Sequence, residues 1–238
     1  MIFTDLINYL ETHQTAEGWL HAHFGQIPPL WQKHVYGKQW TAMTGFGSPN
    51  QTATLEDGWL LYSLVRACKP KICLEIGTAN GFTGIMIGAA LAQNHGGLLY
   101  TVDRDGGAID RARENLFYFG LQHVVVAECG DALKVLPTCC KTLTDGDNKI
   151  DFFFEDGNHG STAIVDEMRI IQPYLAKGCY LAFHDTLFDP NVMQGIDEML
   201  ELFPPNVFEG ITYTTSRGLT VLHHKLSMPL LFEEKHNV

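Results

Sequence analysis

The chain has 238 residues, enough for one domain with a sizeable hydrophobic core, and its 45% hydrophobic and 18% charged residues are ordinary for a globular protein. It carries 16 Lys and Arg against 27 Asp and Glu, a formal charge of −11. This balance argues against nucleic acid as a partner, because binding a phosphate backbone requires a positive face.

The six cysteines form no C-x-x-C pair, and they are expected to be reduced thiols of a cytoplasmic protein. The N-terminus lacks the basic region and apolar core of a signal peptide. No apolar run is long enough to span a bilayer, so no membrane partner is expected.

The chain divides into three parts. Residues 1–54 are predicted to be an N-terminal helical or lid segment, which begins with an amphipathic helix and ends in a loop rich in glycine and proline. Residues 55–225 carry the alternating strand and helix patterns of an α/β domain. Residues 226–238 are an unassigned C-terminal tail.

The domain begins with a predicted helix over residues 55–68, a strand over residues 72–76 and a glycine turn that opens a second helix. The turn runs from Gly77 to Gly81. It lacks the G-x-G spacing of dinucleotide-binding motifs, in which the second glycine lets the backbone approach the pyrophosphate. Glu75, two positions before the turn, would repel a phosphate and suits a ligand with a cationic end. S-adenosylmethionine (SAM), with its sulfonium and ammonium groups, fits this requirement better than NAD.

A second strand over residues 98–102 is closed by Asp103, which stands 22 positions after Gly81. At this spacing a carboxylate can accept hydrogen bonds from the ribose hydroxyls of a bound nucleoside. The alternative role for Asp103 is to cap the helix predicted over residues 109–119. A third strand over residues 123–127 is followed by Asp131, which is also a possible N-cap for a short helix over residues 132–136.

Polar residues 138–149 are predicted to form a surface loop before a buried strand over residues 150–154. That strand leads to Asp156, and the strand over residues 179–183 leads to His184 and Asp185. Ligands gather at the carboxyl ends of strands in open α/β sheets, so these side chains should meet. One imidazole and two carboxylates suit Mg²⁺ or Mn²⁺. The alternative is two helix caps and a core histidine.

The last predicted elements are helices from about residue 161 and over residues 191–203, and two strands over residues 207–214 and 219–224. The two strands are joined by a turn that ends at Gly218, so they are expected to form an antiparallel hairpin.

Three motifs resemble known families. The pattern E-x-G-x-x-x-G from Glu75 to Gly81 resembles the first motif of class I SAM-dependent methyltransferases. The segment F-H-D-T-L-F, residues 183–188, is similar to a strand end of metal-dependent O-methyltransferases of the catechol and caffeoyl-CoA types. The D-x-x-H pattern from Asp156 to His159 resembles the macrocycle-sugar and cephalosporin hydroxylase-like group.

The resemblance covers about residues 55–225 and implies a Rossmann-like class I methyltransferase fold. Its sheet would have seven strands, mostly parallel, with a C-terminal antiparallel hairpin and helices on both faces. The donor SAM would contact Glu75, Gly77, Thr78, Gly81, Thr83, Asp103, Asp131, Ala132 and Asp156. By the same resemblance, Asp131 would lie near the adenine amino group of the donor.

The same resemblance implies a divalent metal held by Asp156, His184 and Asp185, with His159 as the catalytic base. In the catechol and caffeoyl-CoA types an Asp-Asn pair stands where this chain has His184 and Asp185, and a lysine stands in place of His159. The implied reaction is transfer of a methyl group to a hydroxyl of a small molecule.

Three alternatives stay open at this stage. The same fold can methylate oxygen or nitrogen without a metal, a nicotinamide-dependent oxidoreductase is a different class of enzyme, and a non-catalytic subunit could bind the donor alone. A homo-oligomer is compatible with the sequence, which identifies neither the acceptor nor the oligomeric state.

Overall fold

The computed structural model describes residues 53–225. Almost all of the predicted N-terminal segment, residues 1–52, lies outside the described residues, and so does the predicted tail. In residues 53–225, no helix has both the length and the apolar character needed to cross a membrane.

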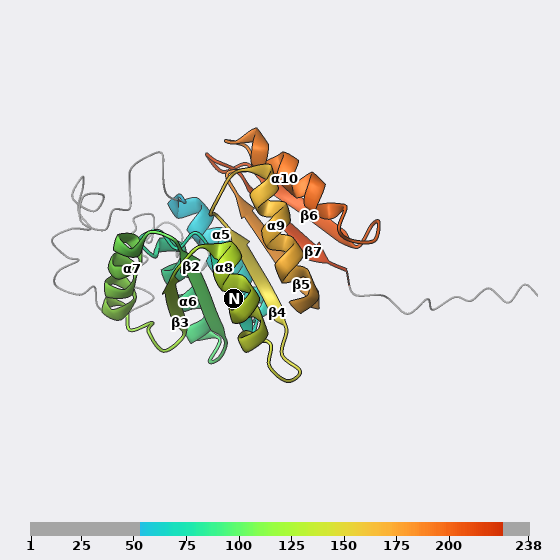
Figure 1. Cartoon of the computed structure of the whole chain (residues 1–238). Coiled ribbons are helices and arrows are strands. Elements are labelled where there is room, and N and C mark those ends of the chain that lie inside the picture. The colour runs from blue at the N-terminus through green and yellow to red at the C-terminus, as the bar shows by residue number, and fades with distance from the viewer. Residues whose placement is uncertain (1–52, 226–238) are drawn as a thin grey trace, which may run out of the picture.

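Helices and strands alternate along the described chain (Figure 1). The elements are, in order, α5 (Leu55–Cys68), β1 (Ile72–Ile76), α6 (Phe82–Gln93), β2 (Leu98–Asp103), α7 (Gly106–Tyr118), β3 (Val125–Cys129), α8 (Ala132–Leu143), β4 (Ile150–Glu155), α9 (Ser161–Ile171), the 3-10 helix η1 (Gln172–Tyr174), β5 (Leu175–His184), α10 (Pro190–Leu200), β6 (Phe208–Tyr213) and β7 (Leu219–His224).

The seven strands form one sheet in the order β3-β2-β1-β4-β5-β7-β6. The first five strands in this order are parallel to one another, whereas β7 is antiparallel to both β5 and β6. The sequence prediction of a mostly parallel seven-stranded sheet with a C-terminal antiparallel hairpin is therefore confirmed. The chain order reverses at β1, between β2 and β4, which is where open α/β sheets bind ligands.

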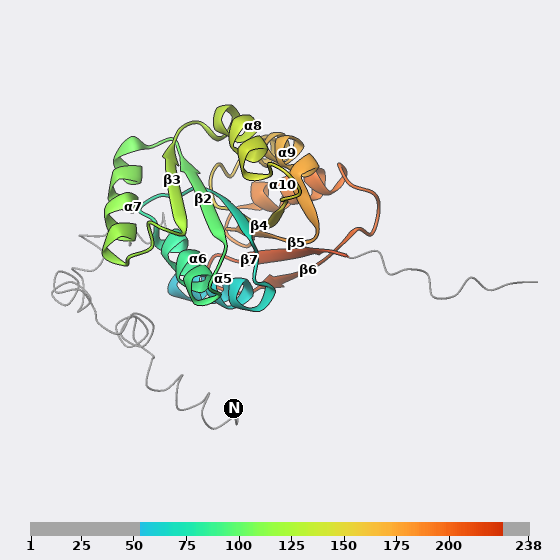
Figure 2. The same ribbon diagram turned by 90° about the horizontal axis from the view of Figure 1, so that it is seen from below.

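Helices cover both faces of the sheet (Figure 2). Helices α5, α6 and α7 contribute to the core on one face, and α8, α9 and α10 contribute to the core on the other. Successive side chains of β4 alternate between them, with Phe152 and Phe154 in the first core and Phe153 in the second. Burial on both faces explains why this strand is a nearly continuous apolar run.

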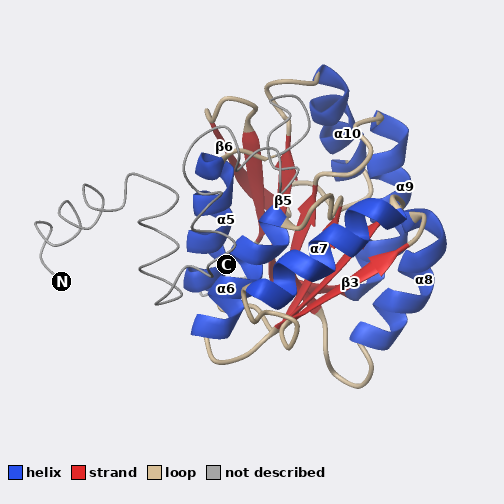
Figure 3. Ribbon diagram, turned by 90° about the vertical axis from the view of Figure 1, so that its left-hand side faces the viewer, coloured by secondary structure: helices blue, strands red, loops and turns tan. Residues whose placement is uncertain are grey.

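The carboxyl ends of the parallel strands lie at the same edge of the sheet (Figure 3). Strand β4 pairs with β1 on one side and with β5 on the other, and Glu155 lies opposite Ile76 and Phe183 in the two registers. The residues that follow these three strands are therefore brought to one place. This register is what assembles the site.

Helix α8 differs from the sequence prediction, which ended a short helix at residue 136 and placed a loop over residues 138–149. The helix continues through Pro137 to Leu143. Leu136, Cys139 and Cys140 are buried on its inner face at helical spacing. Their burial outweighs the backbone hydrogen bond that the proline removes.

Candidate active site

The turn after β1 depends on residues with positive φ. The φ angles of Gly77, Ala79 and Gly81 are 95°, 44° and 85°. A Cβ on Gly77 would collide with the main-chain carbonyl of Asp156, so only glycine fits where the ends of β1 and β4 meet. The amide of Gly77 donates to the carbonyl of Val102 at 2.9 Å, which ties the turn to β2 as well.

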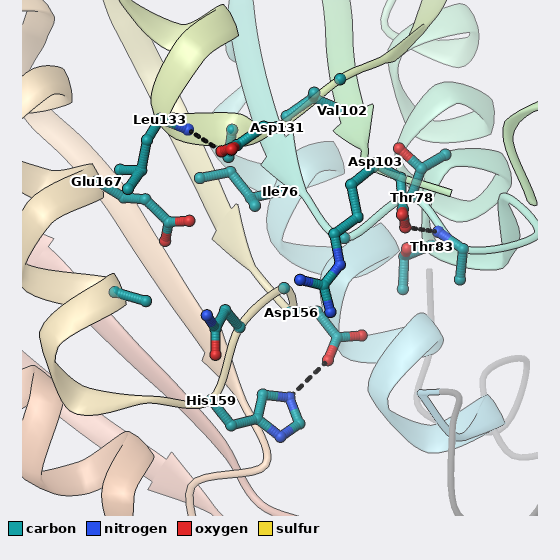
Figure 4. Close-up of a pocket in the computed structure, with 18 of the residues that line it drawn as sticks. Ile76, Thr78, Thr83, Val102, Asp103, Asp131, Leu133, Asp156, His159 and Glu167 are labelled. Atoms are coloured by element: carbon teal, nitrogen blue, oxygen red, sulfur yellow. Dashed lines mark hydrogen bonds and ion pairs between the residues drawn. The ribbon is translucent and has the colours of Figure 1, made fainter. Parts of the chain in front are cut away.

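A cavity of about 600 Å³ opens above this turn (Figure 4). The ends of β1, β2, β3 and β4 line it, together with α9. Seven of the nine predicted donor-binding residues belong to its lining: Gly77, Thr78, Thr83, Asp103, Asp131, Ala132 and Asp156. The topology thus brings most of the predicted donor contacts into one cavity.

Glu75 and Gly81 are the two predicted donor contacts that do not belong to the cavity lining. Glu75 is fully buried behind the turn, where its carboxyl group accepts a hydrogen bond from the Thr83 hydroxyl. Burial raises the pKa of Glu75 to about 7. The sequence located Glu75 near the turn, but the structure places its side chain inside the protein, where it supports the cavity wall.

The two acidic residues predicted to hold the nucleoside also organise the backbone. Asp103 accepts hydrogen bonds from the amides of Ala79 at 2.8 Å and Asp105 at 2.9 Å. Asp131 caps α8 by accepting from the amide of Leu133 at 3.1 Å. A carboxylate has about four acceptor positions, so Asp103 retains capacity for ribose hydroxyls.

A second group of side chains lies next to the cavity, beyond Asp156. Both ring nitrogens of His184 face carboxylates: Nδ1 lies 3.0 Å from Asp156 Oδ1, and Nε2 lies 3.0 Å from Asp57 Oδ2. Burial acts to lower the pKa of His184, but hydrogen bonds to the surrounding carboxylates outweigh it and raise this pKa to about 12. The imidazole is thus a buried cation between two carboxylates.

Asp185 pairs with an arginine that the sequence did not single out. Nε and a terminal nitrogen of Arg217 bind the two oxygens of the Asp185 carboxylate, the second at 2.9 Å. Hydrogen bonds from His184 and Arg217 outweigh burial and hold the pKa of Asp185 below its usual range. Asp185 has a φ of 62°, a left-handed conformation that is uncommon for a residue with a side chain and recurs at functional sites.

His159 joins the cavity to this group. Its Nε2 lies 3.1 Å from Asp185 Oδ2 and 3.9 Å from Asp156 Oδ1, and its Nδ1 lies 3.9 Å from Asp189 Oδ2. The interaction with Asp156 raises the pKa of His159 against the opposing effect of burial. The imidazole keeps 32% of its surface exposed, so a ligand in the cavity can reach it.

Three residues that the structure places in or beside the site were missed by the sequence prediction. Asp57 forms a capping box with Thr54, and its T-x-x-D spacing is visible in the sequence, but this spacing does not indicate contact with His184. Arg217 lies in the turn before β7, where no pattern connects it with Asp185. Glu167 stands three residues after Ile164 and four before Ile171, so its place on the buried face of α9 was readable.

Asp156, His184 and Asp185 have the composition and spacing of a cation site. Within residues 53–225 they are the group of His, Cys, Asp and Glu side chains suited to hold a metal, and their ligand atoms lie within 4.8 Å of one another. The structure thus brings together the three residues that the sequence indicated. Their role as ligands stays a prediction.

Known methyltransferases are similar to this chain in sequence over about half of its length. Residues 74–186 match the family model of a methyltransferase domain. The chain is 30% identical over 112 residues to a catechol O-methyltransferase of Niastella koreensis, a match covering 47% of this chain and 48% of that protein. The matched segment therefore spans about half the length of this relative.

Solved structures share the fold. An O-methyltransferase from Bacillus cereus in complex with SAH has a TM-score of 0.66 at 20% identity, covering 89% of this chain and 98% of that one. An O-methyltransferase from Streptomyces achromogenes involved in tomaymycin synthesis, in complex with SAM, has a TM-score of 0.66 at 21% identity, with coverages of 87% and 95%. The domain match begins in β1 and ends just beyond Asp185, so over residues 74–186 the chain is similar to methyltransferases, and the solved structures share its fold.

Proposed function

We propose that this protein transfers the methyl group of SAM to a hydroxyl group of a small molecule. One observation carries the proposal: Asp156 both lines the donor cavity and belongs to the group formed with His184 and Asp185. The methyl donor and the acceptor would thus both lie next to Asp156. The chain's net charge of −11 favours a small acceptor over nucleic acid, and its free cysteines favour a cytoplasmic location.

His159 is the proposed general base. In a neutral imidazole one nitrogen carries the proton and the other keeps its lone pair. The nitrogen facing Asp185 at 3.1 Å holds the proton, because a carboxylate accepts but does not donate. Nδ1, which lies 3.9 Å from Asp189 Oδ2, then keeps its lone pair and can take the proton of the acceptor hydroxyl, and the oxygen attacks the methyl group held in the cavity.

We propose in addition that Asp156, His184 and Asp185 hold a divalent cation. Their ligand types fit Mg²⁺ or Mn²⁺, provided that His184 gives up one ring proton and Asp185 turns an oxygen away from Arg217. When bound, such a cation lowers the pKa of a coordinated hydroxyl and orients the acceptor. The resemblance of residues 183–188 to metal-dependent O-methyltransferases supports this form of the site.

A metal-independent form of the same reaction is the second candidate, and a specific observation favours it. Both ring nitrogens of His184 and both oxygens of Asp185 already have partners within the protein. Arg217 and protonated His184 would then supply the positive charge beside the acceptor. His159 remains the base in either form.

The deciding experiment is donor turnover across a panel of catechols, phenols, sugars and amines, with EDTA and after addition of Mg²⁺ or Mn²⁺. The metal form predicts that EDTA abolishes turnover. It also predicts that added Mg²⁺ or Mn²⁺ does not restore turnover to Asp156→Ala. The metal-free form predicts turnover that EDTA leaves unchanged. Asp110→Ala, which alters an exposed carboxylate, is the matched control.

The remaining alternatives are separated by the same panel together with binding titrations of SAM and NAD. Turnover of amines alone would replace O-methylation by N-methylation. Donor binding without turnover of any acceptor would favour the non-catalytic subunit, and binding of NAD in place of SAM would favour an oxidoreductase.

A further inference from the structure

A second cavity lies at the amino ends of the parallel strands. Its volume is about 610 Å³, similar to that of the donor cavity. The loop before β1, the chain that enters β4 and the start of β5 line it, and His223 joins them because β7 runs antiparallel to β5. The donor cavity lies at the opposite ends of the strands, so the length of β4, about 20 Å for its six residues, separates the two cavities.

Lysines dominate the charge of this second cavity, which we call the lysine cavity. Residues 53–225 contain seven lysines, and four of them line it: Lys69, Lys71, Lys149 and Lys177. Their charge acts on a neighbouring strand, since burial and then the nearby ammonium group of Lys177 lower the pKa of His224. The cavity is therefore a positive site on a chain whose formal charge is −11.

The two carboxylates in the lining, Asp147 and Asp151, do not neutralise these lysines. Asp151 Oδ2 accepts hydrogen bonds from the amides of Lys71 at 2.8 Å and Ile72 at 3.1 Å, so it binds the backbone instead. Within residues 53–225, none of the four lysines forms an ion pair with a carboxylate. Like charges gathered without counter-ions repel one another, and a bound anion would relieve that repulsion.

The walls of the lysine cavity are held by the fold. Lys69 ends α5 with a φ of 50°, a left-handed conformation in which glycine is the usual residue. On the other side, the rings of Tyr180 and His223 stack with their centroids 4.5 Å apart, because these two residues are paired across β5 and β7. The stacked rings give the cavity a rigid wall against which the uncharged part of a ligand can pack.

We propose that the lysine cavity binds a phosphorylated small molecule that carries at least two negative charges. Lysine binds phosphate as a point charge, and four lysines around one cavity can balance more than one negative charge. The volume of the cavity is in the range of small-molecule sites. Because the two cavities lie at opposite ends of the strands, this ligand would not compete with the methyl donor.

The test titrates the protein calorimetrically with inorganic pyrophosphate and with inorganic phosphate at physiological salt. Wild type should bind pyrophosphate roughly tenfold more tightly than phosphate, and saturation with S-adenosylhomocysteine should not displace it. The double variant Lys71→Gln, Lys177→Gln removes two of the four charges and should weaken pyrophosphate binding by roughly tenfold. Both side chains are exposed, so the variant should keep its fold, which circular dichroism checks.

The matched control is the double variant Lys141→Gln, Arg169→Gln, which removes two exposed positive charges from α8 and α9. Its Kd for pyrophosphate should stay within about twofold of wild type. An equal loss of affinity in both double variants would overturn the inference, because net charge alone would then govern binding. Failure of wild type to bind pyrophosphate, equal affinity for the two anions, or displacement of pyrophosphate by S-adenosylhomocysteine would overturn it too. Tighter binding of duplex DNA than of pyrophosphate would reject a small molecule as the ligand.

Discussion

The Nε2 atom of His159 lies 3.1 Å from Oδ2 of Asp185, although the two residues follow different strands. The pairing of β4 with β5 makes this contact, because it aligns the ends of the two strands. The contact fixes one ring nitrogen as the proton donor and leaves the other facing Asp189. It therefore orients the proposed base before an acceptor arrives.

Replacement of His159 by alanine should slow the chemical step without weakening donor binding. We expect kcat to fall by roughly 10²- to 10⁴-fold, the usual contribution of a general base, with the donor Kd changed by less than about twofold. His123→Ala, an exposed histidine before β3, serves as control. Unchanged kcat in His159→Ala would remove the histidine from the mechanism.

Replacement of Gly77 by alanine should damage both stability and donor binding. The new Cβ would strike the main-chain carbonyl of Asp156, in addition to the strain of a φ of 95°. Gly120→Ala isolates the second effect, because its φ is 67° and nothing lies within 4 Å of the added atom. We expect Gly120→Ala to lower the free energy of unfolding by about 1–2 kcal/mol and Gly77→Ala to lower it further.

Denaturant unfolding and titration with SAM measure the two effects. Equal losses of stability in the two glycine variants, with donor affinity retained in both, would contradict the close approach of β1 and β4 at Gly77.

Truncation of Arg217 should destabilise the protein strongly. Its side chain is 8% exposed and that of Asp185 is 2% exposed, so Arg217→Ala leaves a buried carboxylate without its main partner. We expect the free energy of unfolding to fall by roughly 3–5 kcal/mol. The double variant Asp185→Asn, Arg217→Met should recover part of this loss, because it removes both charges.

Arg169→Ala is the matched control for Arg217. It removes the Arg169–Asp166 pair, whose side chains are 61% and 49% exposed, and should change stability by no more than about 0.5 kcal/mol. If the change in free energy of unfolding of the double variant equals the sum of the changes in the two single variants, the side chains of Asp185 and Arg217 do not interact.

The buried carboxyl group of Glu75 should make the free energy of unfolding fall as the pH rises. Burial raises its folded pKa from 4.5 to about 7, so between these values the folded state keeps a proton that the unfolded state has released. The folded state then binds more protons, and the free energy of unfolding falls with rising pH, by about 3 kcal/mol over the whole interval. Above pH 7 the loss is complete.

Glu75→Gln keeps an acceptor for Thr83 but cannot ionise. The stability difference between this variant and wild type, measured by denaturant unfolding from pH 5 to pH 8, should therefore grow with pH in favour of the variant. A difference that is constant across this range would mean that Glu75 does not titrate there.

The strands of the parallel sheet could be predicted from the sequence because their signals are local. The apolar run before Asp156 is readable without the fold, and the rule that ligands gather at strand ends then joins Asp156 to His184. The sequence prediction ended α8 too early because Pro137 is a strong local stop signal. The buried residues of the helix, which outweigh this signal, are recognised only from their packing against the sheet.

The partners of the site could not be predicted, because they are distant in sequence. Asp57 meets His184 across 127 positions, and Arg217 meets Asp185 across 32. The direction of the Glu75 side chain was equally hidden, since β1 is buried on both faces and shows no alternation that separates cavity from core. Such contacts exist only in the assembled fold.

The left-handed backbone at Asp185 has a consequence for variation at this position. With φ at 62°, the turn after β5 accommodates glycine, asparagine and aspartate far more readily than other residues. Glycine offers no side-chain oxygen, and asparagine offers one without a negative charge to balance Arg217. The backbone therefore limits this position to three residue types. Substitution among them can change the charge of the side chain, whereas the conformation of the turn stays the same.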